Sequence, residues 1–186
     1  TDLSIAVTTS IFEMPIDNYG FQGMFLSGIL DRETYSWDSS ELATDENKPH
    51  VRTEIAHITV GPISFMTVPG EIFPELLIGG YDGSHIGDPS NQIIDEDNPN
   101  PPDLSIAPSG PYITELISSE HPWIVGLGND EIGYIIPEYD FLLDDRLPWF
   151  NEPEGDHYEE TNSLGPKTHA IVRENIELIL DWEESQ

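Results

Sequence analysis

The feature that most restricts the fold is a pair of short apolar segments separated by a tight turn. Residues 50–61, HVRTEIAHITVG, and residues 63–68, ISFMTV, are rich in β-branched side chains and meet at Gly61-Pro62. Short segments of this kind, bounded by turn residues, are typical of strands, so the sequence predicts a β-hairpin here. A further strand is predicted over residues 3–14, which are apolar with partial alternation.

Three other segments complete the predicted secondary structure. The apolar run at residues 122–127 predicts a buried strand. Residues 71–78 predict a short helix that tolerates Pro74 only in its first turn. Residues 166–184 carry apolar side chains at helical spacing and predict the longest helix. Together these elements predict an α/β fold, a mixed sheet with flanking helices, and 186 residues suit one domain or a large part of a bigger one.

A long segment without regular structure is predicted over residues 82–111. It is so dense in proline, glycine, asparagine and aspartate that no element longer than a turn fits. Loops of this length in a compact domain are usually functional or mobile. The oxygen-bearing side chains within DEDNPN suggest two alternatives, a calcium site or a solvated acidic loop. The candidate calcium ligands are Asp95, Asp97, Asn98 and Asn100.

The charge of the chain excludes several classes of partner. It has 36 acidic residues against six lysines and arginines, which gives a formal net charge of −30. Nucleic acid and anionic membrane surfaces would be repelled by such a field. A surface this acidic suggests adaptation to high salt, where counter-ions screen the repulsion. The chain has no cysteine, so a metal site must use histidine, carboxylate or a rarer ligand. It also contains no apolar stretch long enough to predict a spanning helix.

Two places in the chain share one local pattern: an apolar strand, a glycine-containing turn and then a residue with an oxygen that can bind a metal. Glu71 follows the first turn and Tyr134 the second. In α/β folds, sites lie in the crevice beyond the carboxyl ends of strands. Each residue also has an ordinary structural interpretation. Glu71 could be a charge favoured at a helix N-terminus, and Tyr134 a core residue with a satisfied hydroxyl.

The order of three motifs resembles one family. The chain carries VPGE at 68–71, GLGNDEIGY at 126–134 and HYEETNSLGP at 157–166. This order resembles the C-terminal part of the catalytic domain of neutral ceramidases, zinc-dependent amidases of sphingolipids. The resemblance covers roughly residues 50–180. It implies that Glu71 and Tyr134 are zinc ligands and that Tyr158 assists at the scissile carbonyl. The chemistry fits, because a bound divalent ion polarises a carbonyl and activates water.

The chain also departs from the family pattern. An insertion, DDRLPWFNEPEGD, separates Tyr134 from Tyr158. The family's two zinc histidines, its nucleophilic serine and its oxyanion arginine come from an upstream half without a counterpart here. Of the six histidines, His157 beside Tyr158 is the one to watch for a role, against the alternative of a solvated side chain.

The resemblance therefore implies an active site shared with other residues. The expected partner is an N-terminal half of the same protein or a companion chain, and the expected substrate is a lipid-like N-acyl amide. An extracellular or periplasmic location is expected as well. The alternative is a non-catalytic acidic domain that binds calcium or a protein partner.

Overall fold

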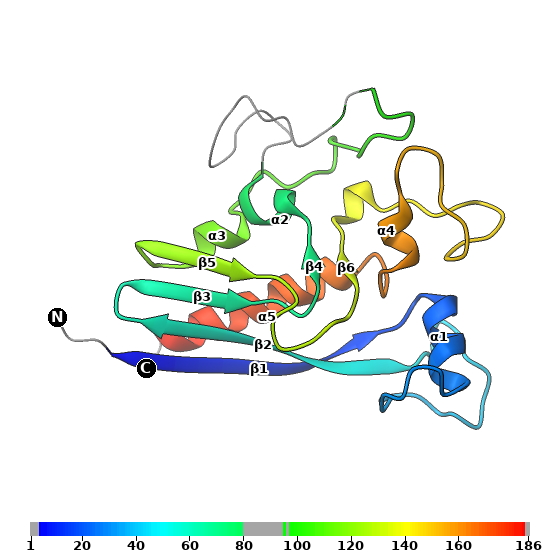
Figure 1. The fold of residues 1–186 in the computed structure, drawn as a ribbon, viewed down its shortest axis with the longest axis horizontal. Coiled ribbons are helices and arrows are strands. Elements are labelled where there is room, and N and C mark those ends of the chain that lie inside the picture. The colour runs from blue at the N-terminus through cyan, green and yellow to red at the C-terminus, as the bar shows by residue number, and fades with distance from the viewer. Residues whose placement is uncertain (1–3, 80–94, 96, 185–186) are drawn as a thin grey trace.

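A computed structural model describes residues 4–79, 95 and 97–184. Its helices and strands form a mixed α/β arrangement (Figure 1), which confirms the predicted fold class. In chain order they are β1 (Ile5–Pro15), α1 (Tyr19–Leu26), β2 (His50–Val60), β3 (Ile63–Thr67), β4 (Glu71–Ile72), α2 (Pro74–Ile78), α3 (Ile113–Leu116), β5 (His121–Val125), β6 (Tyr134–Ile135), a 3₁₀ turn at Glu138–Asp140, α4 (Tyr158–Thr161) and α5 (Thr168–Glu184).

The main sheet has four strands in the order β1-β2-β3-β5. The β1–β2 and β2–β3 pairs are antiparallel, so the predicted hairpin is confirmed, and β3 pairs with β5 in parallel. Beyond the ends of β3 and β5, the two chain paths continue into a second parallel pair, β4 and β6. The two sheets thus place the segments after β3 and β5 side by side.

The long helix α5 covers one face of the four-stranded sheet and runs behind it in Figure 1. Its buried side chains Val172, Ile176 and Ile179 pack in the core with Ile55 and Met66 of the sheet. At the edge of this face, the Ser10 hydroxyl donates to Asn175 Oδ1 of α5 at 2.9 Å. The predicted C-terminal helix is therefore confirmed as the element that closes the core.

The opposite face of this sheet carries a row of apolar side chains that is exposed at both ends. Val7, Ile58, Phe65 and Trp123 are register partners that form this row across the four strands. Val7 is 59% exposed and Trp123 60%, whereas Ile58 and Phe65 are half-buried. The strand predicted at 122–127 is confirmed as β5, but its predicted burial is wrong, because β5 is an edge strand and no described element covers its outward side chains.

Two other predictions need adjustment. The helix expected over 71–78 begins at Pro74, because Glu71 and Ile72 pair with β6 as a strand before proline starts the helix. The long loop of 82–111 falls partly outside the described residues. In its described part, 95 and 97–111, the chain forms only turns and bends. No helix within the described ranges is long and apolar enough to cross a membrane.

Candidate functional site

The structure brings together the three residues for which the sequence predicts roles. Glu71 and Tyr134 are register partners in the β4–β6 pair. The hydroxyls of Tyr134 and Tyr158 lie 2.9 Å apart, and their rings meet edge to face with centroids 5.6 Å apart. All three side chains line one cleft of about 590 Å³. Glu71 therefore lies in a strand that faces Tyr134, not at the start of a helix.

Close backbone contacts explain why glycine precedes both Glu71 and Tyr134. A Cβ atom on Gly70 would lie 2.3 Å from the Gly133 carbonyl oxygen, and one on Gly133 would lie 1.9 Å from the Asn162 carbonyl oxygen. Gly133 also has a φ of +88°, which favours glycine. Because a side chain would separate these segments, the two glycines let β4, β6 and the end of α4 approach each other.

Backbone hydrogen bonds then connect the three segments. Glu71 N donates to Gly133 O at 3.1 Å, and Tyr134 N donates to Asn162 O at 3.0 Å. The Ser163 hydroxyl donates to Tyr134 O at 2.9 Å. The positions of Glu71, Tyr134 and Tyr158 therefore depend on main-chain contacts that are independent of any ligand.

The electrostatics of the cleft favour a neutral Tyr134 in the protein alone. Its hydrogen bond with Tyr158 is the largest of the effects that raise the pKa of Tyr134 above its ordinary value. Desolvation and the nearby Glu71 carboxylate act in the same direction. Tyr134 is therefore a neutral phenol unless a positive charge, such as a metal ion, is added beside it, and either hydroxyl of the tyrosine pair can be the donor.

The sequence prediction missed the wall of this cleft that is contributed by α1. Asn18 begins this helix, since its side chain accepts a hydrogen bond from Phe21 N at 3.2 Å. The helix then presents Phe21, Met24 and Phe25 to the cleft. Gly20, Gln22 and Gly23 interrupt the apolar residues of α1, so the helical periodicity is too weak to predict this helix. The available signal was Asn18, a residue type that often begins a helix, directly before an apolar run.

An ion pair lies at the rim of the same cleft. Both guanidinium nitrogens of Arg32 bond to the Asp130 carboxylate, and one of these contacts measures 3.0 Å. The Thr53 hydroxyl donates to the same carboxylate at 2.8 Å. Although desolvation opposes the charge on Asp130, these bonds lower the pKa of that carboxyl below its ordinary value. Among the described residues that line the cleft, Arg32 is the one with a fixed positive charge.

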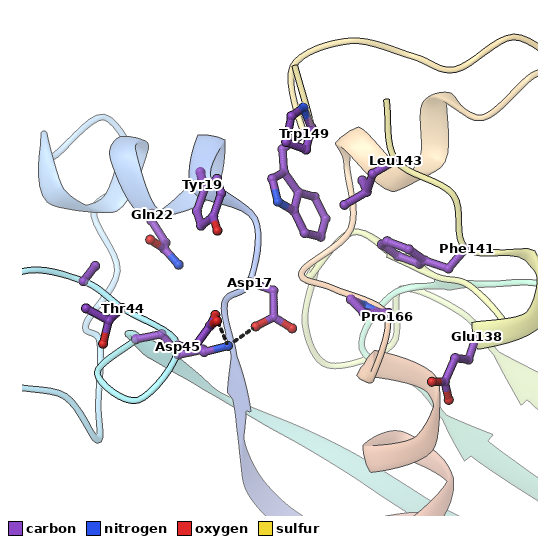
Figure 2. A pocket seen from close by; sticks show the side chains of 13 residues that line it. Asp17, Tyr19, Gln22, Thr44, Asp45, Glu138, Phe141, Leu143, Trp149 and Pro166 are labelled. Carbon is purple, nitrogen blue, oxygen red and sulfur yellow. Dashed lines mark hydrogen bonds and ion pairs between the residues drawn. The ribbon is translucent and has the colours of Figure 1, made fainter. Parts of the chain in front are cut away.

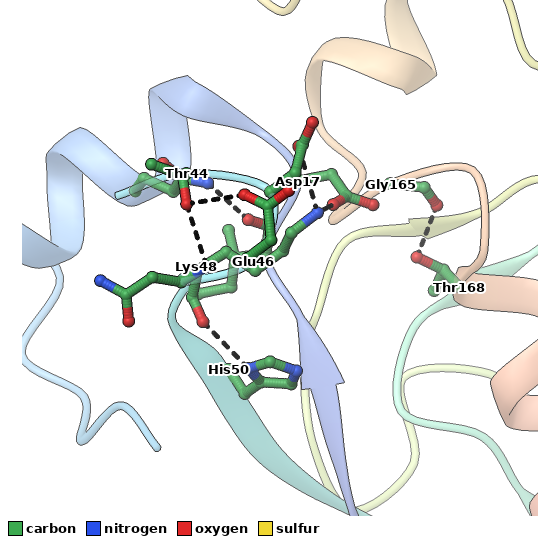
Figure 3. Close-up of polar contacts among 11 residues, drawn as sticks. Asp17, Thr44, Glu46, Lys48, His50, Gly165 and Thr168 are labelled. Carbon is green, nitrogen blue, oxygen red and sulfur yellow. Dashed lines mark hydrogen bonds and ion pairs between the residues drawn. The ribbon is translucent and has the colours of Figure 1, made fainter. Parts of the chain in front are cut away.

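A larger cavity lies elsewhere, has a volume of about 860 Å³ and contains none of the three predicted residues among its lining. Figure 2 shows the aromatic side chains of Tyr19, Phe141 and Trp149 around it. Its lysine, Lys48, binds the Asp17 carboxylate and lies 3.5 Å from Asp45. These contacts, drawn with their neighbours in Figure 3, join the 43–48 segment to the start of α1. We interpret them as structural, because the charge of Lys48 is already balanced.

His157, the histidine singled out by the sequence, is buried and not solvated. Its Nδ1 lies 2.9 Å from Glu160 Oε1, and its Nε2 lies 3.0 Å from the Asn100 carbonyl oxygen. Desolvation lowers the pKa of His157, but the Glu160 carboxylate and the other acceptors outweigh it and raise that pKa above its ordinary value. His157 thus helps to fix the turn that precedes Tyr158 and lies outside the cleft lining.

The four candidate calcium ligands take part in local hydrogen bonds in the described structure. Asp95 Oδ1 accepts from Asp97 N at 3.0 Å, and Asn98 Oδ1 accepts from Asn100 N at 2.8 Å. The amide nitrogens of Asn98 and Asn100 donate to the carbonyl oxygens of Gly155 and Glu154. These side chains thus stabilise local turns and fasten the loop to residues 154–155. Calcium binding by this set stays a prediction.

The donor set of the cleft fits one part of a zinc site. A carboxylate is an ordinary zinc ligand, and a phenol oxygen is a rarer one, whereas catalytic zinc usually takes three protein ligands. Within residues 4–79, 95 and 97–184, no group of three His, Cys, Asp or Glu side chains could hold a metal ion. A zinc ion held by Glu71 and Tyr134 would therefore need at least one further ligand from outside the described residues.

Comparisons with known proteins leave the family open. No family model, curated protein or solved structure matches this chain.

Proposed function

We propose that this chain supplies part of the active site of a zinc-dependent amidase of the ceramidase type. The observation that supports it best is the meeting of Glu71, Tyr134 and Tyr158 in one cleft, although they come from three separate motifs. Glu71 and Tyr134 would hold the ion. When bound, zinc would supply Lewis acidity and an activated water.

The role proposed for Tyr158 follows from its exposure and its contact with Tyr134. Its side chain is 41% exposed and lies at the cleft, so its hydroxyl can reach a bound substrate. The hydroxyl of Tyr134, at 2.9 Å, holds that of Tyr158 in position. A hydroxyl placed in this way can donate a hydrogen bond to the oxyanion that develops during amide cleavage.

The apolar wall of the cleft supports a lipid-like N-acyl substrate. Phe21, Met24 and Phe25 of α1 lie on the same cleft as the three oxygen-bearing side chains. Burying an alkyl chain against such side chains contributes about 0.8 kcal/mol for each methylene. The cleft therefore combines a polar point for the amide with an apolar surface for an acyl chain.

A companion polypeptide is part of this proposal, either an N-terminal half of the same protein or a separate chain. The zinc site lacks ligands, and the sheet has an uncovered apolar face that includes the Val7-to-Trp123 row. Across four strands about 4.8 Å apart, this row and its apolar neighbours give a patch of roughly 200 Å². Contiguous exposed apolar side chains are a feature of interaction sites.

A second copy of this chain is a weaker candidate for that face. The patch is smaller than the roughly 800 Å² per partner of a stable interface. Two copies, each with a net charge of −30, would also repel each other. A companion layer in the same polypeptide needs less buried area, because its attachment raises its effective concentration.

The uncovered face also supports the alternative, a non-catalytic acidic domain that binds a protein partner. Metal analysis and amide hydrolysis separate the two functions. The chain alone should bind zinc weakly and hydrolyse nothing, whereas the chain with its companion should hold zinc and cleave an N-acyl amide. An assembled protein that neither holds a divalent ion nor cleaves such an amide would favour the partner-binding domain. We also propose an extracellular or periplasmic setting, which fractionation of the native source would test.

A further inference from the structure

A second, smaller cavity outside the cleft is lined by six carboxylates together with Phe73, Asn98, Pro102 and His157. It has a volume of about 190 Å³ and lies between α2, the described part of the long loop, the 3₁₀ turn and α4. Its described lining includes no lysine or arginine. The lining carboxylates are Glu75, Asp95, Asp140, Asp156, Glu159 and Glu160.

Glu75 is the member of this set with an unbonded carboxylate oxygen, although its own backbone N–H donates a hydrogen bond to the carboxylate. It is the second residue of α2, and its side chain is only 9% exposed. Its Oε2 atom is buried and has no hydrogen-bond partner among the described residues. Buried polar atoms are nearly always bonded, so an unbonded carboxylate oxygen that lines a cavity indicates a missing water or ion.

The other acidic groups increase the negative potential of the cavity. Desolvation, and then the neighbouring Asp140, raise the pKa of Glu75. Desolvation also raises the pKa of Asp140, to about 6, and the Glu160 and Glu159 carboxylates contribute to that shift. His157 offsets part of the charge through its contact with Glu160. His157 also lines the cavity and lowers the pKa of Asp140, but the cavity lining has six carboxylates against this one imidazole.

We propose that this cavity binds a hard divalent cation, Mg²⁺ or Ca²⁺, with Glu75 and Asp140 as the principal anions and water as part of the coordination shell. Retained water follows from the geometry, since no three acidic or histidine side chains of the described chain are placed to hold an ion directly. A cavity of about 190 Å³ has room for an ion with several waters. Ions of this class prefer oxygen ligands, and Mg²⁺ in particular keeps its waters.

The surrounding loop is already in place to form one wall of the site. Asn98 lines the cavity, and its amide nitrogen donates to the Gly155 carbonyl oxygen at 2.6 Å. A cation bound at Glu75 and Asp140 would link α2 to the 3₁₀ turn and to this loop. This role is independent of the proposed zinc site, which lies in the other cleft.

The test uses the full chain, stripped of ions with a chelator and kept at a fixed molar KCl concentration so that non-specific screening is constant. Titration with MgCl₂ and with CaCl₂, followed by calorimetry and thermal unfolding, should show saturable binding and a rise in Tm for at least one ion. Glu75→Gln and Asp140→Asn should each weaken this binding at least about tenfold. The control is Glu174→Gln, which removes the same charge at an exposed position of α5.

Measuring the Tm of each variant in the chelator separates loss of ion binding from loss of folding. Without the ion, Glu75→Gln should be at least as stable as the unmodified chain, because it removes a buried carboxylate with an unbonded oxygen. Loss of ion binding in a folded variant then supports the site. The proposal is overturned if neither ion binds saturably to the unmodified chain. It is also overturned if Glu75→Gln and Asp140→Asn bind as tightly as Glu174→Gln.

Discussion

Tyr134 and Tyr158 meet through their hydroxyls, 2.9 Å apart, with ring planes at 85° to each other. One phenol lies in β6 and the other begins α4, so the contact joins two elements separated by a long irregular segment. Glu71 completes the group from β4. The side-chain contact therefore connects segments that are far apart in the sequence.

The first prediction concerns the metal. In the assembled protein, Glu71→Gln should reduce zinc affinity more than about tenfold and abolish amide hydrolysis, because a charged ligand is lost. Elemental analysis and a hydrolysis assay on the same samples check this. Glu174→Gln is the control for charge alone. Full metal content together with full activity in Glu71→Gln would contradict the ligand role.

The second prediction separates metal binding from catalysis. Tyr158→Phe should keep zinc and substrate affinity but lower kcat by roughly 100-fold, since only a transition-state hydrogen bond is removed. Steady-state kinetics with metal analysis measure both effects. Tyr19→Phe, a change in the larger cavity, should leave kcat unaltered. An unchanged kcat in Tyr158→Phe would assign that hydroxyl a structural role.

The third prediction concerns salt. Because the chain carries a net charge of −30, its Tm should rise steeply as KCl increases from low to molar concentration. Screening shortens the Debye length from about 30 Å at 0.01 M to about 3 Å at 1 M and so reduces repulsion between exposed carboxylates. Thermal unfolding by circular dichroism measures it. A flat Tm over this range would rule out charge repulsion as the main salt-dependent effect.

The fourth prediction concerns pH and Asp140, whose pKa burial raises to about 6. A carboxyl with a raised pKa lowers the stability of the folded state when it is ionised. This loss of stability disappears as the pH falls from about 6, the pKa in the folded state, to about 4, the pKa in the unfolded chain. Asp140→Asn should therefore raise Tm at pH 8 and have little effect at pH 4. The measurement requires a chelator, so that no bound cation compensates the charge. An equal effect at both pH values would place its origin in packing.

The fifth prediction concerns the uncovered sheet face. Because the chain has no cysteine, a single thiol reports its own accessibility. Val7→Cys should react rapidly with a thiol reagent in the chain alone and slowly once the companion polypeptide is present. Leu178→Cys on α5, which is 61% exposed, should react in both states. Equal reactivity of Val7→Cys in both states would show that the companion binds elsewhere.

Sequence reasoning located the elements with strong periodicity and missed those that depend on tertiary contacts. The hairpin around Gly61-Pro62 and the helix α5 carry their pattern locally. The two-residue strands β4 and β6 do not, because their pairing is set by the backbone approach at Gly70 and Gly133. Trp123 looked buried because an apolar side chain on an uncovered sheet face has the same sequence signature as one in a core.

The candidate site was predictable in part, because local motifs are visible in the sequence and tertiary contacts are not. Glu71, Tyr134 and Tyr158 were named from motifs, and the structure shows that they lie together. The acidic cavity was not predicted, because Glu75, Asp140 and Glu160 are far apart in the chain and share no motif. Only the arrangement of α2, the 3₁₀ turn and α4 around one cavity shows that these carboxylates share a site.

The glycines at positions 70 and 133 change how these motifs should be used to judge other sequences. Each glycine is required by a backbone contact, so a chain that has lost its chemistry would still keep both for folding alone. The carboxylate at Glu71, by contrast, is exposed and contributes little to the core. A homologue with the glycines but without the acid would therefore be expected to share the architecture and to lack the metal ligand that we propose at Glu71.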